Sequence, residues 1–415
     1  MQRKLRWGMV GGGEHSQIGG AHRMGAGLDG LFELAAGALD IVPEKGREFA
    51  MRHGVARERA YGDWREMLAQ ERDLPPGERL DLVTVATPNS THFEIAQAFL
   101  RNGFHVLCEK PLATTIEDAE ALLLTAQEQR RILAVNYGYT GYPMVRQARA
   151  MVKAGDLGAV RVVVAEFAHG SHADAADAEN PRVRWRYDPD QAGVSSVLAD
   201  TGLHALHMSC FVIGRSVARV AADFASCVAG RALEDDAMVT LRFSGGEVGR
   251  LWASAVAVGQ THGLTLRVFG ERGGLRWSQE QPNQLAWTPL GQPTQILERG
   301  AAGLAPEADR ASRITVGHTE GMLPAFANVY ADLAAEIRRR ATAGDMPPVA
   351  VAYPTGEDGL HTLAVVHAAA ESARRGSRWI DLGTQRPETG GWGTTATKSS
   401  SALTDRPQSP SPLTK

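Results

Sequence analysis

The sequence is poor in cysteine and has no large surplus of either charge. Its 415 residues contain three cysteines, Cys108, Cys210 and Cys227, and none belongs to a CxxC pair. A disulfide framework and a zinc knuckle are therefore not expected. Lys and Arg number 44 against 47 acidic residues, which gives a formal net charge of −3, and no basic block runs along the chain. Nucleic acid is not an expected partner.

Long apolar runs are also missing. The apolar part of the N-terminal "MQRKLRWGMVGGG" is too short for a signal peptide, and no later segment approaches the roughly 18 uncharged apolar residues of a membrane span. We therefore expect no membrane insertion, and the few cysteines favour a cytoplasmic protein. The length, together with 43% hydrophobic residues, predicts two globular domains.

The first third of the chain alternates β-rich runs with helical periodicity. Apolar runs cover residues 5–10, 32–39, 80–87, 104–109 and 132–138, and segments such as 92–103 and 116–131 between them have a helical pattern. This order predicts an α/β fold with a parallel sheet and right-handed crossovers. The runs are apolar almost throughout, as expected of strands covered on both faces.

From about residue 160 the pattern changes to longer alternating runs without intervening helices. The segments "FSGGEVG" and "FGERGGL" are typical of hairpin turns, so we expect a mostly antiparallel sheet, closed by helices around 324–340 and 360–376. We expect a dinucleotide-binding domain at 1–142 and a second α/β domain at 143–383. Residues 384–415 are rich in Gly, Ser, Thr and Pro, which predicts a disordered tail.

A glycine-rich loop follows the first predicted strand. In "GMVGGGEHSQIGGAHRMG", Gly11 and Gly13 are candidates for a tight turn against a pyrophosphate, and Gly19 for close helix packing. Five residues separate Gly13 from Gly19, so the loop is longer than in G-x-G-x-x-G. Asp40 ends the second strand, where a carboxylate binds the adenosine ribose and favours NAD over NADP. The alternatives are a flexible turn and an ordinary turn acid.

The stretch "VLCEKPLATT" places Glu109, Lys110 and Pro111 where the fourth predicted strand ends. Rossmann folds bind ligands at the carboxyl ends of their strands, so Lys110 is expected to point into the cofactor crevice. Taken alone, it could equally be a solvated lysine in a turn.

Three segments in this order, "ATPNSTH", "EKP" and "DTGLHALH", resemble the glucose-fructose oxidoreductase / inositol dehydrogenase / rhizopine-catabolism (Gfo/Idh/MocA) family, up to about residue 383. The resemblance implies an N-terminal Rossmann domain and a C-terminal α/β domain whose large open sheet often forms an oligomer interface. It also implies a catalytic set of Lys110, Asp200 and His204, and a nicotinamide side formed by Thr87, Pro88, Asn89, His92 and the Glu109–Lys110 pair. The sequence departs from the family pattern in the glycine loop, at His207 and in "YGYTGY" at 137–142.

Asp200, His204 and His207 are spaced i, i+4 and i+7, which would bring them to one face of a helix. They could be structural polar groups, or two imidazoles and a carboxylate that bind Zn or Fe(II), although no further ligand cluster lies nearby. As an acid–base site, His204 would take the proton of a substrate hydroxyl, and Asp200 would orient it or bind a neighbouring hydroxyl. The family resemblance favours the acid–base site, and we predict no metal.

Candidate substrate residues come from two segments. The loop "NPRVRWRYDPDQAG" carries arginines suited to an anionic group and a tryptophan suited to stacking on a sugar, unless it is simply a solvated loop. The second segment carries Tyr139, Tyr142 and Arg146, and the resemblance implies that it lies on the substrate side. The alternative is ordinary packing around the start of a helix. The full set is Arg184, Trp185, Arg186, Tyr139, Tyr142, Arg146 and His207.

These features predict an NAD-dependent oxidoreductase that acts on a secondary hydroxyl of a sugar, sugar derivative or polyol. One alternative, also implied by the resemblance, is an NAD-dependent glycosidase that works by transient C3 oxidation, elimination, hydration and re-reduction. A dinucleotide-binding sensor is a third, although it would not need Lys110, Asp200 and His204 together. We expect a homodimer or homotetramer formed through the C-terminal sheet.

Overall fold

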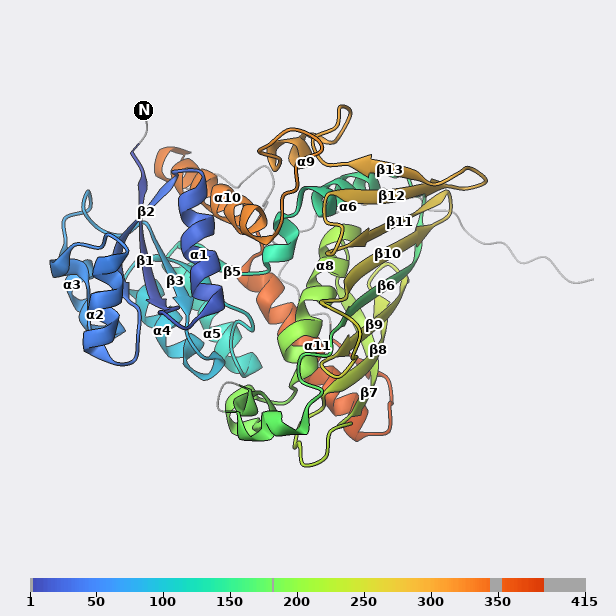
Figure 1. Ribbon diagram of the computed structural model, residues 1–415, viewed down its shortest axis with the longest axis horizontal. Helices are drawn as coiled ribbons and strands as arrows, with labels where there is room; N and C mark the ends of the chain where they lie inside the picture. The colour runs from blue at the N-terminus through green and yellow to red at the C-terminus, as the bar shows by residue number, and fades with distance from the viewer. Residues whose placement is uncertain (1–2, 181–182, 344–352, 384–415) are drawn as a thin grey trace, which may run out of the picture.

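The structure, a computed structural model, describes residues 3–180, 183–343 and 353–383 and contains two sheets (Figure 1). The first is five-stranded and parallel, in the order β2-β1-β3-β4-β5. Its strands are β1 (Leu5–Gly11), β2 (Phe32–Ala38), β3 (Leu82–Ala86), β4 (His105–Cys108) and β5 (Leu133–Val135). Each lies within the corresponding predicted run or extends one residue past it, and the predicted Rossmann-type α/β fold is confirmed.

Helices cover both faces of this first sheet. Because neighbouring strand residues point to opposite sides, Val83 and Val85 pack with α4 while Leu82 packs with α10. The N-terminal helices are α1 (Gln17–Leu28), α2 (Pro43–Arg52), α3 (Trp64–Asp73), α4 (His92–Arg101) and α5 (Ile116–Glu128).

The second sheet has nine strands in the order β13-β12-β11-β10-β6-β9-β8-β7-β14, and only the β6–β9 pair is parallel. The predicted glycine hairpins join β8 to β9 and β10 to β11. A large, mostly antiparallel sheet is therefore confirmed. Its strands are β6 (Val160–Ala168), β7 (Val217–Ala225), β8 (Asp236–Phe243), β9 (Val248–Ser254), β10 (Leu264–Gly270), β11 (Gly273–Ser278), β12 (Gln284–Pro289), β13 (Gln295–Glu298) and β14 (Ile380–Asp381).

One face of the second sheet packs on helices and the other is open. Helices α6 (Pro143–Ala154), α8 (Leu203–Ile213) and α11 (Gly356–Arg374) lie between the two sheets in Figure 1. Along β6, Val163, Ala165 and Phe167 are buried against this layer, whereas Val162 and Val164 point to the open face. The remaining helices of the second half are α7 (Pro189–Ala192), α9 (Pro306–Arg310) and α10 (Met322–Ala343).

Helix α10 returns to the first sheet after the second sheet is complete. Val329, Tyr330 and Leu333 are buried with Trp7 and Leu82 in one core, and α10 packs along α1 (Figure 1). The division at residues 142 and 143 stays a prediction, because a helix late in the sequence completes the N-terminal core.

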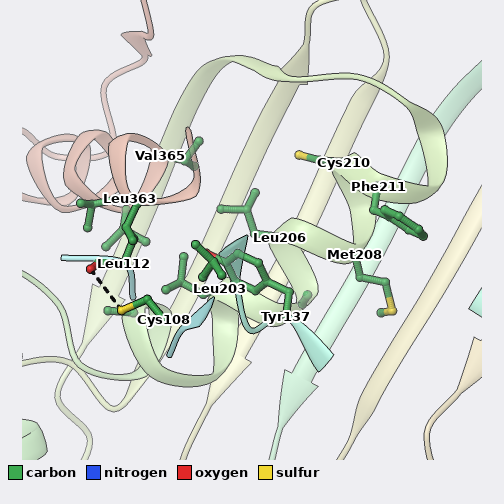
Figure 2. Close-up of a cluster of buried hydrophobic side chains, with 14 of the residues drawn as sticks. Cys108, Leu112, Tyr137, Leu203, Leu206, Met208, Cys210, Phe211, Leu363 and Val365 are labelled. Carbon is green, nitrogen blue, oxygen red and sulfur yellow. Dashed lines mark hydrogen bonds between the residues drawn. The ribbon is translucent and has the colours of Figure 1, made fainter. Parts of the chain in front are cut away.

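A second core joins the two halves of the molecule. Figure 2 shows Cys108 and Leu112, at the end of β4, beside Leu203 and Leu206 of α8 and Leu363 of α11. All five side chains are almost completely buried. This packing fixes the end of β4 against α8.

None of the described helices is long and apolar enough to cross a membrane. The three cysteines, all within the described residues, form no disulfide. The predicted disordered tail, 384–415, lies outside the described residues.

Candidate active site

The glycine-rich segment at the start of α1 leaves no room for a side chain at Gly11, Gly12, Gly13 and Gly19. Gly11 and Gly12 have φ of 77° and 69°, a conformation that favours glycine. A Cβ on Gly13 would lie 2.4 Å from the carbonyl oxygen that follows β2, and one on Gly19 would lie 2.0 Å from the Gly12 oxygen. Ser16 caps α1 by accepting a hydrogen bond from the Gly19 amide at 3.1 Å. The loop therefore brings bare backbone to a helix N-terminus, which suits a pyrophosphate.

Asp40 lies beside this loop, just after β2. Its Oδ1 accepts a hydrogen bond from the Val42 amide at 2.9 Å. Its Oδ2 would be 3.3 Å from a Cβ built on Gly13. The carboxylate thus borders the glycine loop at the position expected for the adenosine ribose. These residues fit NAD.

Thr87 borders the loop from the other side. A Cβ on Gly11 would lie 2.7 Å from the Thr87 methyl group, and the Thr87 hydroxyl accepts a hydrogen bond from Thr91 at 2.8 Å. Pro88 and Asn89 begin the 3₁₀ turn Asn89–Thr91 that leads into α4. The segment therefore lies at the carboxyl edge of the sheet, next to the glycine loop.

Lys110 reaches from the end of β4 into the second half of the molecule. Its Nζ donates to Asp200 Oδ1 at 2.6 Å and to the Asp200 carbonyl oxygen at 2.7 Å. Arg186 donates from Nε to Asp200 Oδ2 at 3.0 Å. Burial alone would raise the pKa of Asp200, but the Lys110 and Arg186 charges hold it well below its usual range. Asp200 is a fixed anion between two cations.

Asp200 lies in a π-helical turn, Leu198–Gly202, which runs directly into α8. Such turns are rare and occur frequently at functional sites. The buried Glu234 holds the turn's start, because its Oε1 accepts hydrogen bonds from Ser195 Oγ at 2.6 Å and from the Ser196 amide at 2.9 Å. The predicted regular helical face is thus replaced by a wider turn, which aims Asp200 at Lys110.

His204, one turn later, faces the same pocket. Its ring packs edge-on against Tyr139, with centroids 4.8 Å apart, and its buried Nδ1 has no hydrogen-bond partner among the described residues. Burial, with a smaller contribution from the Lys110 charge, lowers the pKa of His204 to about 3. The imidazole is therefore neutral and able to accept a proton.

A small pocket of about 60 Å³ between the two halves is lined by both Lys110 and His204, and Asp200 contacts the pocket residue Lys110. The Tyr139 hydroxyl lies 2.9 Å from His262 Nε2, so one predicted substrate residue is oriented by a residue that the sequence did not single out. The pocket is lined by Ile18, Glu109, Lys110, Asn136, Gly138, Tyr139, Tyr142, His204, Met322 and Phe326. A wider hollow of about 590 Å³, lined by residues such as Arg267 and Arg276, lies away from this chemistry on the open face of the second sheet.

Three of the predicted site residues have their side chains elsewhere. His92 is buried, with Nδ1 2.8 Å from the Pro111 oxygen and Nε2 2.9 Å from the Thr87 oxygen, so it joins two loops. Arg146 is buried and donates to Asp332 of α10 at 2.6 Å. His207 is buried and stacks on Tyr137 at 4.0 Å. Each was assigned from spacing or resemblance, which does not show the direction of a side chain.

The arginine-rich loop also has one predicted residue that reaches the site and one that does not. Arg186 reaches the site through Asp200, and its guanidinium lies 4.6 Å from the Trp185 ring centroid. Arg184 is exposed. Among the described residues, no group of three or more His, Cys, Asp or Glu side chains could hold a metal ion.

Sequence reasoning missed Gly12, His22 and Asn136. Gly12 could have been found as the middle of three glycines, and Asn136 as the residue that follows β5 at the ligand-binding edge. His22 lies inside α1 and gave no signal. Its Nε2 lies 2.9 Å from Glu109 Oε1, and Asn136 also donates to that oxygen.

Comparison with known proteins decides the family. Residues 5–137 match the family model "Oxidoreductase family, NAD-binding Rossmann fold", and residues 145–276 match the GFO/IDH/MocA C-terminal domain. The chain belongs to the Gfo/Idh/MocA family. It is accordingly an NAD(P)-dependent oxidoreductase with an NAD-binding Rossmann domain.

Several Gfo/Idh/MocA relatives extend over most of the chain. The uncharacterized oxidoreductase YfiI of Bacillus subtilis is 35% identical over 92% of this chain and 98% of its own length. The inositol dehydrogenase homolog of Azotobacter vinelandii in complex with NAD⁺ is 42% identical, with a TM-score of 0.88 over 92% of this chain and 98% of that one. The same homolog was also solved with NADH and myo-inositol, at a TM-score of 0.84 with 40% identity and the same coverage. Levoglucosan dehydrogenase of Pseudarthrobacter phenanthrenivorans is 27% identical over 68% of this chain and 76% of its own.

Proposed function

We propose that this protein is an NAD-dependent dehydrogenase that oxidises a secondary hydroxyl of a polyol or sugar. The observation that carries the proposal is one pocket lined by Lys110 and a neutral His204, with Asp200 bonded to Lys110. The myo-inositol bound by the Azotobacter vinelandii homolog and the levoglucosan named for the second relative are both polyhydroxy compounds, which supports this substrate class.

The charges of Lys110, His204 and Asp200 determine the role that each has in the proposed reaction. The Lys110 ammonium donates to the substrate oxygen and stabilises the negative charge that develops there. His204, whose ring is neutral, accepts the hydroxyl proton. Asp200 keeps Lys110 in place and balances the charge on the protonated His204. NAD⁺, which the glycine loop and Asp40 would hold, would supply the hydride acceptor for the carbinol carbon.

The cofactor preference follows from Asp40. A carboxylate beside Gly13 suits the two ribose hydroxyls of NAD and repels the 2′-phosphate of NADP. The glycosidase alternative gains no support from the relatives named above or from the pocket. The cytoplasmic location stays a prediction from the sequence.

We also propose that the open face of the second sheet joins copies of this chain. Met238 and Phe269 on this face are 49% and 44% exposed, and Trp252 lies directly opposite Met238 on the next strand. Exposed apolar side chains on one sheet face are typical of an interface. Light scattering of the purified protein tests this proposal, and a monomer at micromolar concentration would contradict it.

The function is tested with purified protein, NAD and a panel of inositols, anhydrosugars, free sugars and aryl glycosides. NADH absorbance and released phenol are read in the same wells. NADH formation that Lys110→Ala abolishes supports the dehydrogenase. Phenol release without net NADH formation would indicate a glycosidase instead. If the protein binds NAD but forms neither NADH nor phenol, it would be a sensor.

A further inference from the structure

A buried chain of polar side chains runs from the first sheet to the active-site pocket. Trp7 Nε1 donates to Thr84 Oγ1 at 2.9 Å, and Thr84 Oγ1 lies 3.0 Å from the Tyr330 hydroxyl. That hydroxyl lies 2.8 Å from His22 Nδ1, and His22 Nε2 lies 2.9 Å from Glu109 Oε1. All five residues are 6% exposed or less. The chain connects β1, β3, α10 and α1 to the residue that precedes Lys110.

The two end groups of this chain have fixed roles as hydrogen-bond donor and acceptor. An indole N–H can only donate, and an ionised carboxylate can only accept. Trp7 therefore donates to Thr84 at one end, His22 Nε2 donates to Glu109 at the other, and the Tyr330 hydroxyl joins Thr84 to His22 Nδ1. Because the Glu109 carboxylate can only accept, His22 carries a hydrogen on Nε2.

Glu109 is held as an anion by several hydrogen bonds. Asn136 donates to the same Oε1, and the Lys110 backbone amide donates to Oε2 at 3.1 Å. Burial would raise the pKa of Glu109, but both the hydrogen bond and the electrostatic interaction with His22, together with the Asn136 hydrogen bond and the Lys110 charge, lower it to about 2. The Lys110 ammonium itself is bonded to Asp200.

Glu109 and Asn136 line the pocket that also contains His204 and Lys110. The proposed reaction requires the nicotinamide ring to lie against a substrate held by those two residues, and thus near Glu109. The oxidised ring carries a positive charge and the reduced ring carries none. A fixed anion in a partly desolvated pocket discriminates between them by its Coulomb energy.

We propose that Glu109, held by His22 as a positioning residue, makes the site favour oxidised over reduced nicotinamide. The inference rests on the proposed function only for the location of the nicotinamide. It assigns the His22 chain a role in cofactor discrimination, in addition to its contribution to packing.

The test measures the dissociation constants of NAD⁺ and NADH without substrate, by calorimetry and by NADH fluorescence. Glu109→Gln keeps the shape and removes the charge, so NAD⁺ should bind about tenfold more weakly while the NADH constant changes less than about twofold. His22→Leu should shift the ratio in the same direction. His22→Gln retains a donor toward Glu109 and should restore the ratio.

Glu71→Gln is the matched control, because Glu71 is a fully buried carboxylate of the same domain, bonded to Arg59 and Tyr61. It should leave the ratio unchanged. Equal weakening of both cofactors by Glu109→Gln would overturn the inference and leave a purely structural role. If His22→Leu does not fold, Glu109→Gln and His22→Gln decide between these outcomes. Failure of the wild type to bind either cofactor would refute the proposed function instead.

Discussion

Replacing Lys110 by Met is the sharpest test of the proposed chemistry. The thioether fills most of the lysine's volume but offers no donor, so the substrate oxygen loses the Lys110 ammonium that Asp200 holds in place. Removal of a single donor to a developing oxyanion lowers kcat by about 10²- to 10³-fold, or about 3 to 4 kcal/mol. We expect that loss in both kcat and kcat/KM, because the interaction strengthens in the transition state.

The same variant should fold and bind cofactor. Asp200 keeps its hydrogen bond to Arg186 and is 33% exposed, so we expect the free energy of unfolding to change by no more than about 1 to 2 kcal/mol. The glycine loop that holds the pyrophosphate is not altered, so the NAD dissociation constant should change less than about threefold.

The assay follows NADH formation with the substrate found in the panel, with denaturant unfolding and NAD calorimetry on the same preparations. Lys153→Met, an exposed lysine near the end of α6, is the control for loss of a positive charge. A Lys110→Met protein that keeps more than about a tenth of the wild-type kcat/KM while folded would refute the assigned role.

Three further changes test other parts of the molecule. Gly19→Ala places a Cβ 2.0 Å from the Gly12 carbonyl oxygen, so NAD should bind at least about tenfold more weakly by calorimetry; an unchanged constant would contradict the loop assignment. Asp40→Ser should raise the NADP-to-NAD ratio of kcat/KM by at least about tenfold, and an unchanged ratio would remove Asp40 from the ribose site. Burial lowers the pKa of His105 to about 3, so the folded state stays unprotonated while the unfolded chain binds a proton below about pH 6.5. The free energy of unfolding therefore falls as the pH drops through this range, and His105→Gln should reduce that slope in urea titrations; an equal slope would show that His105 contributes nothing.

The sequence predicted the elements well because their patterns are local. Strands covered on both faces are apolar throughout, and the hairpins at 243–249 and 269–275 are marked by glycine. The return of α10 to the first sheet was not predictable in the same way. Its apolar stripe shows that it packs, and only the tertiary structure shows that Tyr330 reaches Trp7 and His22.

Within the site, predictions were informative where a motif fixes the backbone and weak where the side-chain direction matters. Lys110 and His204 line one pocket, and Lys110 contacts Asp200. His207, three residues further along α8, was expected on the same face as His204 but is buried against Tyr137. A regular helix assigns Asp200 and His207 to a shared face, whereas the π turn at Leu198–Gly202 changes the register between them.

The catalytic geometry depends on packing that no motif encodes. Lys110 comes from β4 and Asp200 from the turn before α8, so their 2.6 Å contact crosses the two halves of the chain. The contact is partly exposed, and pairs of this kind contribute little net stability because desolvation offsets their attraction. The ion pair therefore cannot itself hold the halves together. That task falls to the core in which Cys108 and Leu112 meet Leu203 (Figure 2), where close packing resists displacement. The Lys110 side chain is thus positioned by the buried residues Cys108 and Leu112, which lie on either side of it in the sequence.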